Sequence, residues 1–157
     1  AVSLVPPGNI KDTLSTGEKF GYALLHKLGS LKKMVSGKPI WIKYKYSYDD
    51  IYFTKEGAEE AKKLNYLQTT IPTTNYPTLM QFDLYEYAKN VEKPVMIVGA
   101  DKDIVVPPEQ VKKIYELIPS KEKTYLQLEN CGHGCDDPPI RDKLKHTVYN
   151  WLKRYCR

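Results

Sequence analysis

The sequence predicts an α/β fold in which helices pack on the faces of a parallel sheet. Two observations support this class, and both come from residues 94–157. Two short segments, 94–99 and 124–128, have the composition of strands. Each is followed by a segment whose apolar residues recur every three or four positions, as in an amphipathic helix. The order strand, helix, strand, helix favours a parallel sheet.

The N-terminal element is expected to be a short strand over residues 1–7. A Pro-Pro-Gly sequence must end it, because proline cannot donate a hydrogen bond to a neighbouring strand. The long stretch that follows, residues 10–90, is irregular in pattern and rich in tyrosine. Its first helix is expected over about residues 17–28. One face of that helix would carry Phe20, Leu24 and Leu28.

Three more elements are expected before the C-terminal region. Residues 41–48 alternate with a period of two for a few positions, which suits a strand or an extended arm. A helix is expected over residues 55–64, because Thr54 before it is a suitable N-cap. The Asn-Tyr-Pro sequence at 75–77 should break the chain, and a third helix is expected over about residues 79–89.

The C-terminal region has the clearest pattern. The run at 94–99 is apolar throughout and ends in glycine, which is typical of a strand buried on both faces. Two prolines open the next helix, and Pro119 ends it. The last helix begins with the prolines at 138–139, and Asp136 or Asp137 is the expected cap. The expected buried face of the first helix is Val111, Ile114, Tyr115 and Ile118, and that of the last is Ile140, Leu144, Val148, Trp151, Leu152 and Tyr155.

Composition narrows the possible classes of protein. The net charge is +5, but the lysines are spread along the chain and interleaved with acids, so solvated helix faces are favoured over a nucleic-acid partner. No apolar stretch approaches the roughly 20 residues of a membrane span. Three cysteines argue against a disulfide framework, and we therefore expect a reducing, cytoplasmic location. Because the chain begins at Ala1 and not at Met, a processed product or a fragment is expected.

The candidate chemistry lies where the two C-terminal strands end. Asp103 follows the first strand and His133 follows the second. Because function gathers at the carboxyl ends of parallel strands, the two loops should lie side by side. A carboxylate there can accept the N–H of an imidazole and fix its tautomer, which leaves the other ring nitrogen free as a general base. Glycines on both sides of His133 should let the backbone bend and keep the ring accessible.

These residues resemble a known family. The segment 94–107, with its strand, glycine, aspartate and downstream proline, is similar to the acid loop of α/β-hydrolases, and the Gly-His-Gly within 128–134 is similar to their histidine loop. The resemblance implies three parts. Residues 1–9 would be the core strand before the lid, 10–90 the mainly helical lid, and 91–157 the C-terminal core.

The resemblance implies specific roles. Asp103 matches the acid of the catalytic triad best, because Pro107 lies four residues after it, while Asp101 is the alternative acid. His133 matches the catalytic base; His26 and His146 match nothing. The implied reaction is hydrolysis of an ester, thioester or small amide through a serine acyl-enzyme, with no cofactor and a small acyl substrate.

The nucleophile is missing from this sequence. The family places it on a Gly-x-Ser-x-Gly elbow before the acid, and none of the serines here has those flanking glycines. We therefore expect the chain to be inactive by itself, and an N-terminal half or partner chain to supply the serine. The first strand would then be an exposed sheet edge that such a chain pairs with. The alternative is a non-catalytic, hydrolase-like binding module.

Other uses of the same residues are weaker. Cys131, His133 and Cys135 have ligand types that suit zinc, but a Cys-x-His-x-Cys spacing within five residues is not a usual structural pattern. Cys131 is too close in sequence to His133 to act as its nucleophile. Several tyrosines in the lid could line an aromatic pocket or stack on bases, although packing within the lid is the favoured role. They are Tyr44, Tyr46, Tyr48 and Tyr52.

Overall fold

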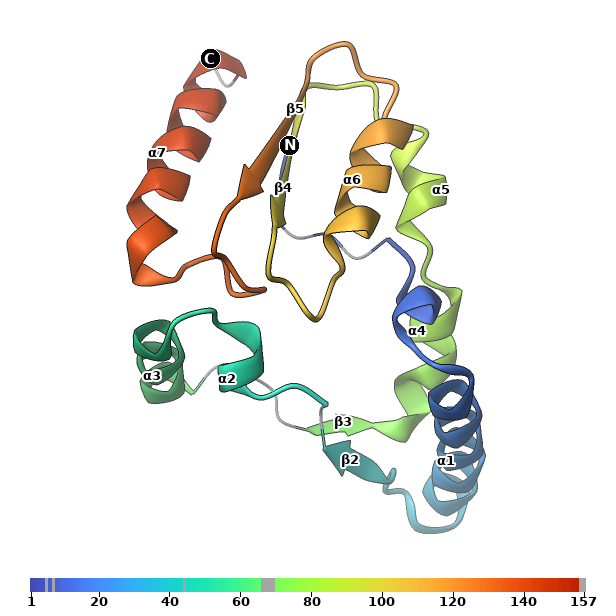
Figure 1. Cartoon of the computed structure of the whole chain (residues 1–157). Helices are drawn as coiled ribbons and strands as arrows, with labels where there is room; N and C mark the ends of the chain where they lie inside the picture. Colours follow the sequence, from blue (N-terminus) through green and yellow to red (C-terminus); the bar gives the residue numbers. More distant parts are fainter. Residues whose placement is uncertain (5, 7, 44, 66–69, 156–157) are drawn as a thin grey trace.

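Three parallel strands form the larger sheet of the molecule, between α6 and α7 in Figure 1. In this computed structural model the described residues are 1–4, 6, 8–43, 45–65 and 70–155. The strands are β1 (Val2–Leu4), β4 (Val95–Ala100) and β5 (Lys123–Leu128), in the order β1-β4-β5. The predicted α/β class, with a parallel sheet, is confirmed.

Helices cover both faces of the sheet, which is why all six residues of β4 are buried. Val95 and Ile97 pack in the cluster on the side of α6 (Pro108–Leu117). Met96 and Val98 point the other way, into the cluster on the side of α7 (Pro138–Tyr155). Figure 1 shows α6 and α7 on opposite sides of the strands. The alternation follows from the period of two in a strand.

The predicted apolar faces of the two helices are mostly correct. Val111, Ile114 and Ile118 are buried under β4. In α7, Leu144 and Trp151 are buried, but Leu152 is exposed and does not belong to the buried face. At about 100° per residue, Leu152 lies roughly 80° around the helix from Leu144, at the edge of the stripe.

The first helix after β1 is longer than expected. A 3-10 turn, η1 (Ile10–Thr13), leads into α1 (Thr16–Ser36). The apolar period continues beyond residue 28, and Gly37 ends the helix with a φ of 72°, in the left-handed region that favours glycine. The face expected to hold three apolar residues exists, but it points to solvent: Phe20, Leu24 and Leu28 are exposed.

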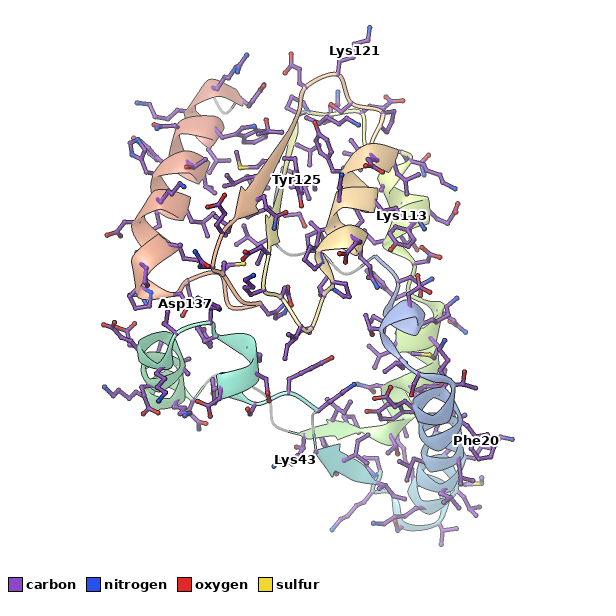
Figure 2. The ribbon with its side chains drawn as sticks, viewed as in Figure 1. Phe20, Lys43, Lys113, Lys121, Tyr125 and Asp137 are labelled. Atoms are coloured by element: carbon purple, nitrogen blue, oxygen red, sulfur yellow. The ribbon has the colours of Figure 1, made fainter. Side chains whose placement is uncertain are left out.

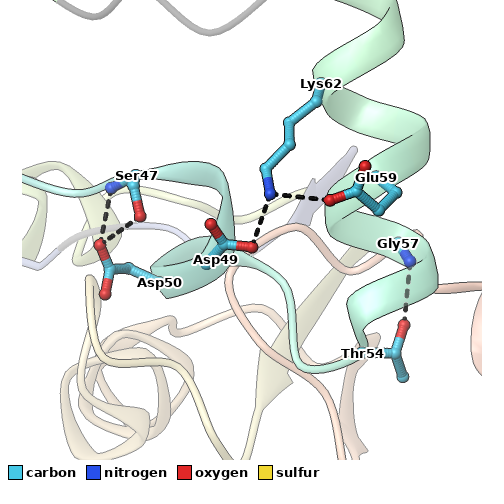
Figure 3. Close-up of polar contacts among 7 residues, drawn as sticks. All are labelled: Ser47, Asp49, Asp50, Thr54, Gly57, Glu59 and Lys62. Atoms are coloured by element: carbon cyan, nitrogen blue, oxygen red, sulfur yellow. Dashed lines mark hydrogen bonds and ion pairs between the residues drawn. The ribbon is translucent and has the colours of Figure 1, made fainter.

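The stretch expected to be extended over 41–48 is a short strand followed by a helix. Strand β2 (Trp41–Lys43) pairs antiparallel with β3 (Thr70–Pro72). Helix α2 (Tyr48–Ile51) then begins at the last residue of the expected arm. Ser47 is the reason, because its N–H and hydroxyl both donate to the Asp50 carboxylate, each at 2.7 Å (Figure 3).

Helix α3 (Lys55–Leu64) has the predicted bounds. Thr54 caps it as expected, since its Oγ1 accepts the backbone N–H of Gly57 at 3.1 Å. Figure 3 also shows the Lys62 ammonium between Asp49 of α2 and Glu59 of α3. The Lys62–Asp49 pair joins the two helices, whereas the Lys62–Glu59 pair lies within α3.

The single helix expected over 79–89 is wrong. After η2 (Thr73–Asn75) the chain forms α4 (Tyr76–Gln81) and α5 (Leu84–Ala88), with no break at 75–77 because Pro77 fits the first turn of α4. The interruption falls at Asp83, which caps α5 by accepting the N–H of Tyr85 at 3.0 Å. Asp83 also accepts the side-chain amide of Asn9 at 3.1 Å, a contact 74 residues away in sequence.

The elements between β1 and β4 lie mainly beyond the carboxyl ends of the strands (Figure 1). Helix α5 is different, because Tyr85 and Ala88 pack against α6. The division into strand, lid and C-terminal core at residues 9 and 90 remains a prediction. Across the described ranges, none of the helices combines the length and the apolar character that crossing a membrane requires.

Candidate active site

The loops after β4 and β5 lie side by side, as the parallel register requires. Ala100 and Leu128, the last residues of the two strands, are paired partners. Beyond them, the N–H of Asp101 donates to the Leu128 carbonyl at 3.0 Å and the N–H of Lys102 to the Cys131 carbonyl at 3.0 Å. Backbone hydrogen bonds alone thus fix the two loops to each other.

Asp103 and His133 meet at this junction. The Nδ1 atom of His133 lies 2.9 Å from Oδ2 of Asp103. The other carboxylate oxygen of Asp103 accepts the backbone N–H groups of Val105 and Val106, both at 2.8 Å. The Asp103 side chain is fully buried, whereas that of His133 is 29% exposed. An N–H at Nδ1 therefore donates to a rigidly held carboxylate, and Nε2 is left for chemistry.

Asp101, the alternative acid, has a different position. Its carboxylate accepts the backbone N–H of Cys131 at 3.1 Å. Burial opposes ionisation of Asp101, but hydrogen bonds from the backbone of Cys131 and Asn130 outweigh that effect and lower its pKa. Asp101 thus holds the start of the histidine loop, while the described contacts of the His133 ring include Asp103 and not Asp101.

The glycines beside His133 serve close packing. A Cβ on Gly132 would lie 2.4 Å from the carbonyl oxygen of Ile51, and one on Gly134 would lie 2.6 Å from the Tyr52 ring. The N–H of Gly134 also donates to the Ile51 carbonyl at 3.1 Å. Neither glycine has a positive φ, so the expected bending of the backbone is not their role. They let the α2–α3 connection lie directly against the histidine loop.

Asp137 fixes the same connection, a structural role that the sequence did not predict. It was expected only as a candidate cap of α7, and its backbone carbonyl does accept the N–H groups of Ile140 and Arg141. Its carboxylate points away, to the N–H of Phe53 at 3.0 Å and to the N–H and hydroxyl of Thr54 at 3.1 and 2.6 Å.

The Asp137 side chain is therefore an anchor between the α2–α3 connection and the histidine loop. It is completely buried, and Figure 2 shows it at the junction of α7 with α3. Asp136, the other candidate cap, is exposed. No local pattern predicts a contact over 84 residues, so sequence reasoning had no signal for it.

The two cysteines beside His133 are buried free thiols. Both Cys131 and Cys135 have Sγ near the Gly132 carbonyl. A hydrogen bond with Cys135, together with burial, raises the pKa of the Cys131 thiol, which keeps it protonated and a poor nucleophile. In the part of the chain that the structure describes, no three ligating side chains gather as a metal site needs. The cytoplasmic location remains a prediction.

A cavity of about 450 Å³ opens beside the Asp103–His133 pair. His133 lies on its wall, and Leu4, Val105 and Val106 contribute from the core side. The remaining lining residues come from elements between β1 and β4 and are mostly apolar or aromatic. They are Ile10, Thr13, Leu14, Tyr22, Lys45, Tyr46, Ile71, Pro72, Thr73, Tyr76, Leu79 and Met80.

The tyrosines at 44–52, which could line a pocket or pack within the lid, do not all have the same role. Tyr46 lines the cavity, whereas Tyr52 packs against the histidine loop, and Tyr44 is outside the described residues. Two tyrosines that the sequence did not single out, Tyr22 and Tyr76, stack at 6.0 Å between ring centroids and also line the cavity. None of the six serines of the chain lines it.

Comparisons with known proteins identify relatives of this chain. The profile of the family described as "PETase: PET hydrolase-like" matches residues 57–157. A bis(hydroxyethyl) terephthalate hydrolase of Streptomyces coelicolor is 30% identical over 99 residues, covering 62% of this chain and 30% of that protein. An uncharacterized 31.7 kDa protein of Escherichia coli, from the traX-finO intergenic region, is 25% identical over 154 residues, covering 92% of this chain.

Solved structures share the fold at low sequence identity. The monoacylglycerol lipase of Paleococcus ferrophilus superposes with a TM-score of 0.74 at 15% identity, over 98% of this chain and 58% of the lipase. A soluble variant of the monoglyceride lipase of Saccharomyces cerevisiae gives a TM-score of 0.72 at 15% identity, over 98% of this chain and 55% of that enzyme. The chain spans about half the length of the E. coli relative, 52%.

Proposed function

Because the chain belongs to the PET hydrolase-like family, we propose that it supplies the acid and the base of a serine hydrolase that cleaves carboxylic esters. The predicted resemblance to α/β-hydrolases is confirmed by the family and by the solved structures of the same fold. Thioesters and small amides are the neighbouring substrate classes for the same chemistry. The reaction needs no cofactor, since the groups proposed for it are protein side chains.

The observation that carries the proposal is the Asp103–His133 pair on the wall of an apolar cavity. Asp103 accepts the Nδ1–H of His133 and stabilises the charged ring. Nε2 of His133 then takes the proton from the attacking serine hydroxyl and returns it to the leaving group. The buried carboxylate can be held in one orientation because two backbone N–H groups bind its other oxygen.

We propose that the serine and the oxyanion hole come from an N-terminal half or a partner chain. The sequence contains no Gly-x-Ser-x-Gly elbow. Strand β1 pairs with β4 on one side only within the described residues. A further strand added at the open side of β1 would end beside Leu4, on the rim of the cavity that His133 faces.

The substrate we propose is an ester whose acyl or aromatic part is uncharged. The cavity is lined mainly by apolar side chains and tyrosine rings, which favour apolar ligand surface. Lys45 is the one lysine among the described lining residues, and Glu18 already pairs with it at 2.8 Å. In this proposal the elements between β1 and β4 act as the lid that selects the substrate.

The test uses material purified under native conditions from the source organism. Mass spectrometry under non-denaturing and then denaturing conditions identifies any second polypeptide, and a fluorophosphonate probe labels an activated serine. We expect a chain with a Gly-x-Ser-x-Gly peptide that carries the label, and hydrolysis of a p-nitrophenyl ester. The isolated 157-residue chain should neither take the label nor hydrolyse the ester.

Two variants and a control make the test specific. We expect Asp103→Asn to lower kcat by about 10⁴-fold, because the wrong tautomer is then favoured, and His133→Asn to lower it by about 10⁶-fold. His146→Asn, on the exposed side of α7, is the matched control and should leave kcat unchanged. A single species with the mass of this chain and no labelled partner would instead favour the binding module.

A further inference from the structure

Helix α1 packs on the protein through a polar and aromatic face and turns its apolar face to solvent, whereas a surface helix usually does the opposite. Gly29 is the one buried residue of α1, held against the Thr73 side chain, where a Cβ would clash at 2.0 Å. The same side of α1 carries Tyr22, which stacks on Tyr76, and His26, whose Nδ1 lies 3.2 Å from the Thr73 carbonyl oxygen. The inner face is thus aromatic and polar, and its contacts hold the helix on the rest of the molecule.

The outer face of α1 is apolar and uncovered. Figure 2 shows Phe20 pointing away from the rest of the molecule. Phe20 is 73% exposed, and Val35 near the other end of the helix is 81% exposed. The residues that form this apolar stripe recur at intervals of three or four, so they lie on one side of the helix. They are Phe20, Leu24, Leu28, Leu31 and Val35.

Lysines flank the apolar stripe on both edges. At about 100° per residue, Lys27 falls roughly 20° beyond Phe20, with the exposed Met34 roughly 20° further round, and Lys32 falls roughly 40° beyond Leu28 at the other edge. Both lysines are exposed. Residues 16–45 contain seven lysines and one acid, Glu18, which is already paired with a lysine.

We propose that the outer face of α1 docks on an anionic lipid surface. A helix with an apolar stripe, a basic margin and low overall hydropathy lies in the plane of a membrane with its apolar face in the acyl boundary. The flanking lysines can extend their ammonium groups to the headgroups while their methylene chains cover the apolar edge. Their unbalanced positive charge fits phosphate-bearing headgroups.

The charges argue against a second copy of the chain as the occupant. Two α1 stripes packed together would bring the lysine margins of both helices into proximity, with no free carboxylate on α1 to neutralise them. A lipid surface removes that conflict. Since Tyr22 on the inner face lines the cavity, docking also places the cavity within about 10 Å, one helix diameter, of the lipid. The proposal concerns binding and is independent of catalysis.

Co-sedimentation with vesicles tests the proposal. The natively purified protein is mixed with vesicles of phosphatidylcholine and phosphatidylglycerol, and separately with phosphatidylcholine alone. We expect binding to the anionic vesicles that weakens steeply with salt, and little binding to the neutral ones. Lys27→Gln and Lys32→Gln should each weaken binding by about fivefold at low salt. Lys63→Gln, an exposed lysine of α3, is the matched control.

Apolar variants complete the test. Leu28→Asp should abolish vesicle binding, whereas Leu64→Asp, which changes a leucine 72% exposed at the end of α3, should have no effect. Far-UV circular dichroism verifies that both variants keep their helices. Three results would overturn the proposal: equal binding of the two leucine variants, no vesicle binding at all, or sedimentation without lipid showing a dimer or a copurifying chain that Leu28→Asp releases.

Discussion

Replacing Asp137 by alanine should loosen the connection between α2 and α3 from the histidine loop. Three donors lose their acceptor: the N–H groups of Phe53 and Thr54, and the Thr54 hydroxyl. An orphaned buried donor costs about 1–3 kcal/mol. Removal of a buried charge offsets part of the sum, so we expect a net loss of about 3–4 kcal/mol in the free energy of unfolding.

Urea unfolding of the purified protein, followed by circular dichroism, measures this loss. With an m value of about 2 kcal/mol/M, the midpoint should fall by roughly 1.5–2 M. Asp136→Ala is the matched control, because its side chain is the exposed neighbour, and its midpoint should shift by less than about 0.3 M. Equal shifts for the two variants would refute the assignment of Asp137 as an anchor.

Gly57 provides an independent test of the same contact. A Cβ there would lie 2.2 Å from Oδ1 of Asp137, so Gly57→Ala should destabilise the protein by about 1–3 kcal/mol although alanine favours helices. In the Asp137→Ala background that oxygen is gone and the cost should fall. A double-mutant cycle should therefore give a coupling energy of about 1–2 kcal/mol, and additive effects would show that the two residues do not interact.

Three further predictions follow from separate features. Cys131 should react with iodoacetamide at least about 100-fold more slowly in the native protein than in urea, because burial and Cys135 raise its thiol pKa; equal rates would contradict this. Lys45 and Ser15 lower the pKa of Glu18 from 4.5 to about 2. The contribution of Glu18 to stability is therefore present above pH 4.5 and is lost as the pH falls towards 2. Lys45→Met should raise the pKa of Glu18 in a carboxyl NMR titration. Met96→Ala should lower the free energy of unfolding by about 2–5 kcal/mol in urea titrations, because the Met96 side chain is 1% exposed between β4 and α7. A loss below about 1 kcal/mol would mean that the site collapses around the smaller residue.

The C-terminal core could be predicted from the sequence because its signals are local and agree with one another. Strand β4 is apolar without interruption, and the face of α6 repeats every three or four residues. The pairing of Asp103 with His133 followed from a rule about parallel strand ends, not from a detail of either loop. Local pattern and tertiary structure coincide best in β4, because that strand is buried on both faces.

The region between β1 and β4 could not be predicted as well, because its bounds depend on distant contacts. The break between α4 and α5 falls at Asp83, whose carboxylate accepts the side-chain amide of Asn9 from the other end of that region. The anchor at Asp137 depends on Thr54, which is 83 residues away in sequence. The apolar pattern of α1 correctly indicated a helix, but a pattern cannot say which face meets the protein. Phe20 is exposed, so the apolar face of α1 points to solvent and not to the protein.

The register of the sheet also bears on the order in which the chain folds. Val2 pairs with Met96, so β1 joins the sheet only when more than ninety residues have been drawn together. Strands β4 and β5 close a much shorter connection through α6, and short connections cost less entropy and form faster. We expect the β4–α6–β5 unit to nucleate folding and β1 to dock last. Substitutions in β1 should then speed unfolding while leaving the folding rate nearly unchanged.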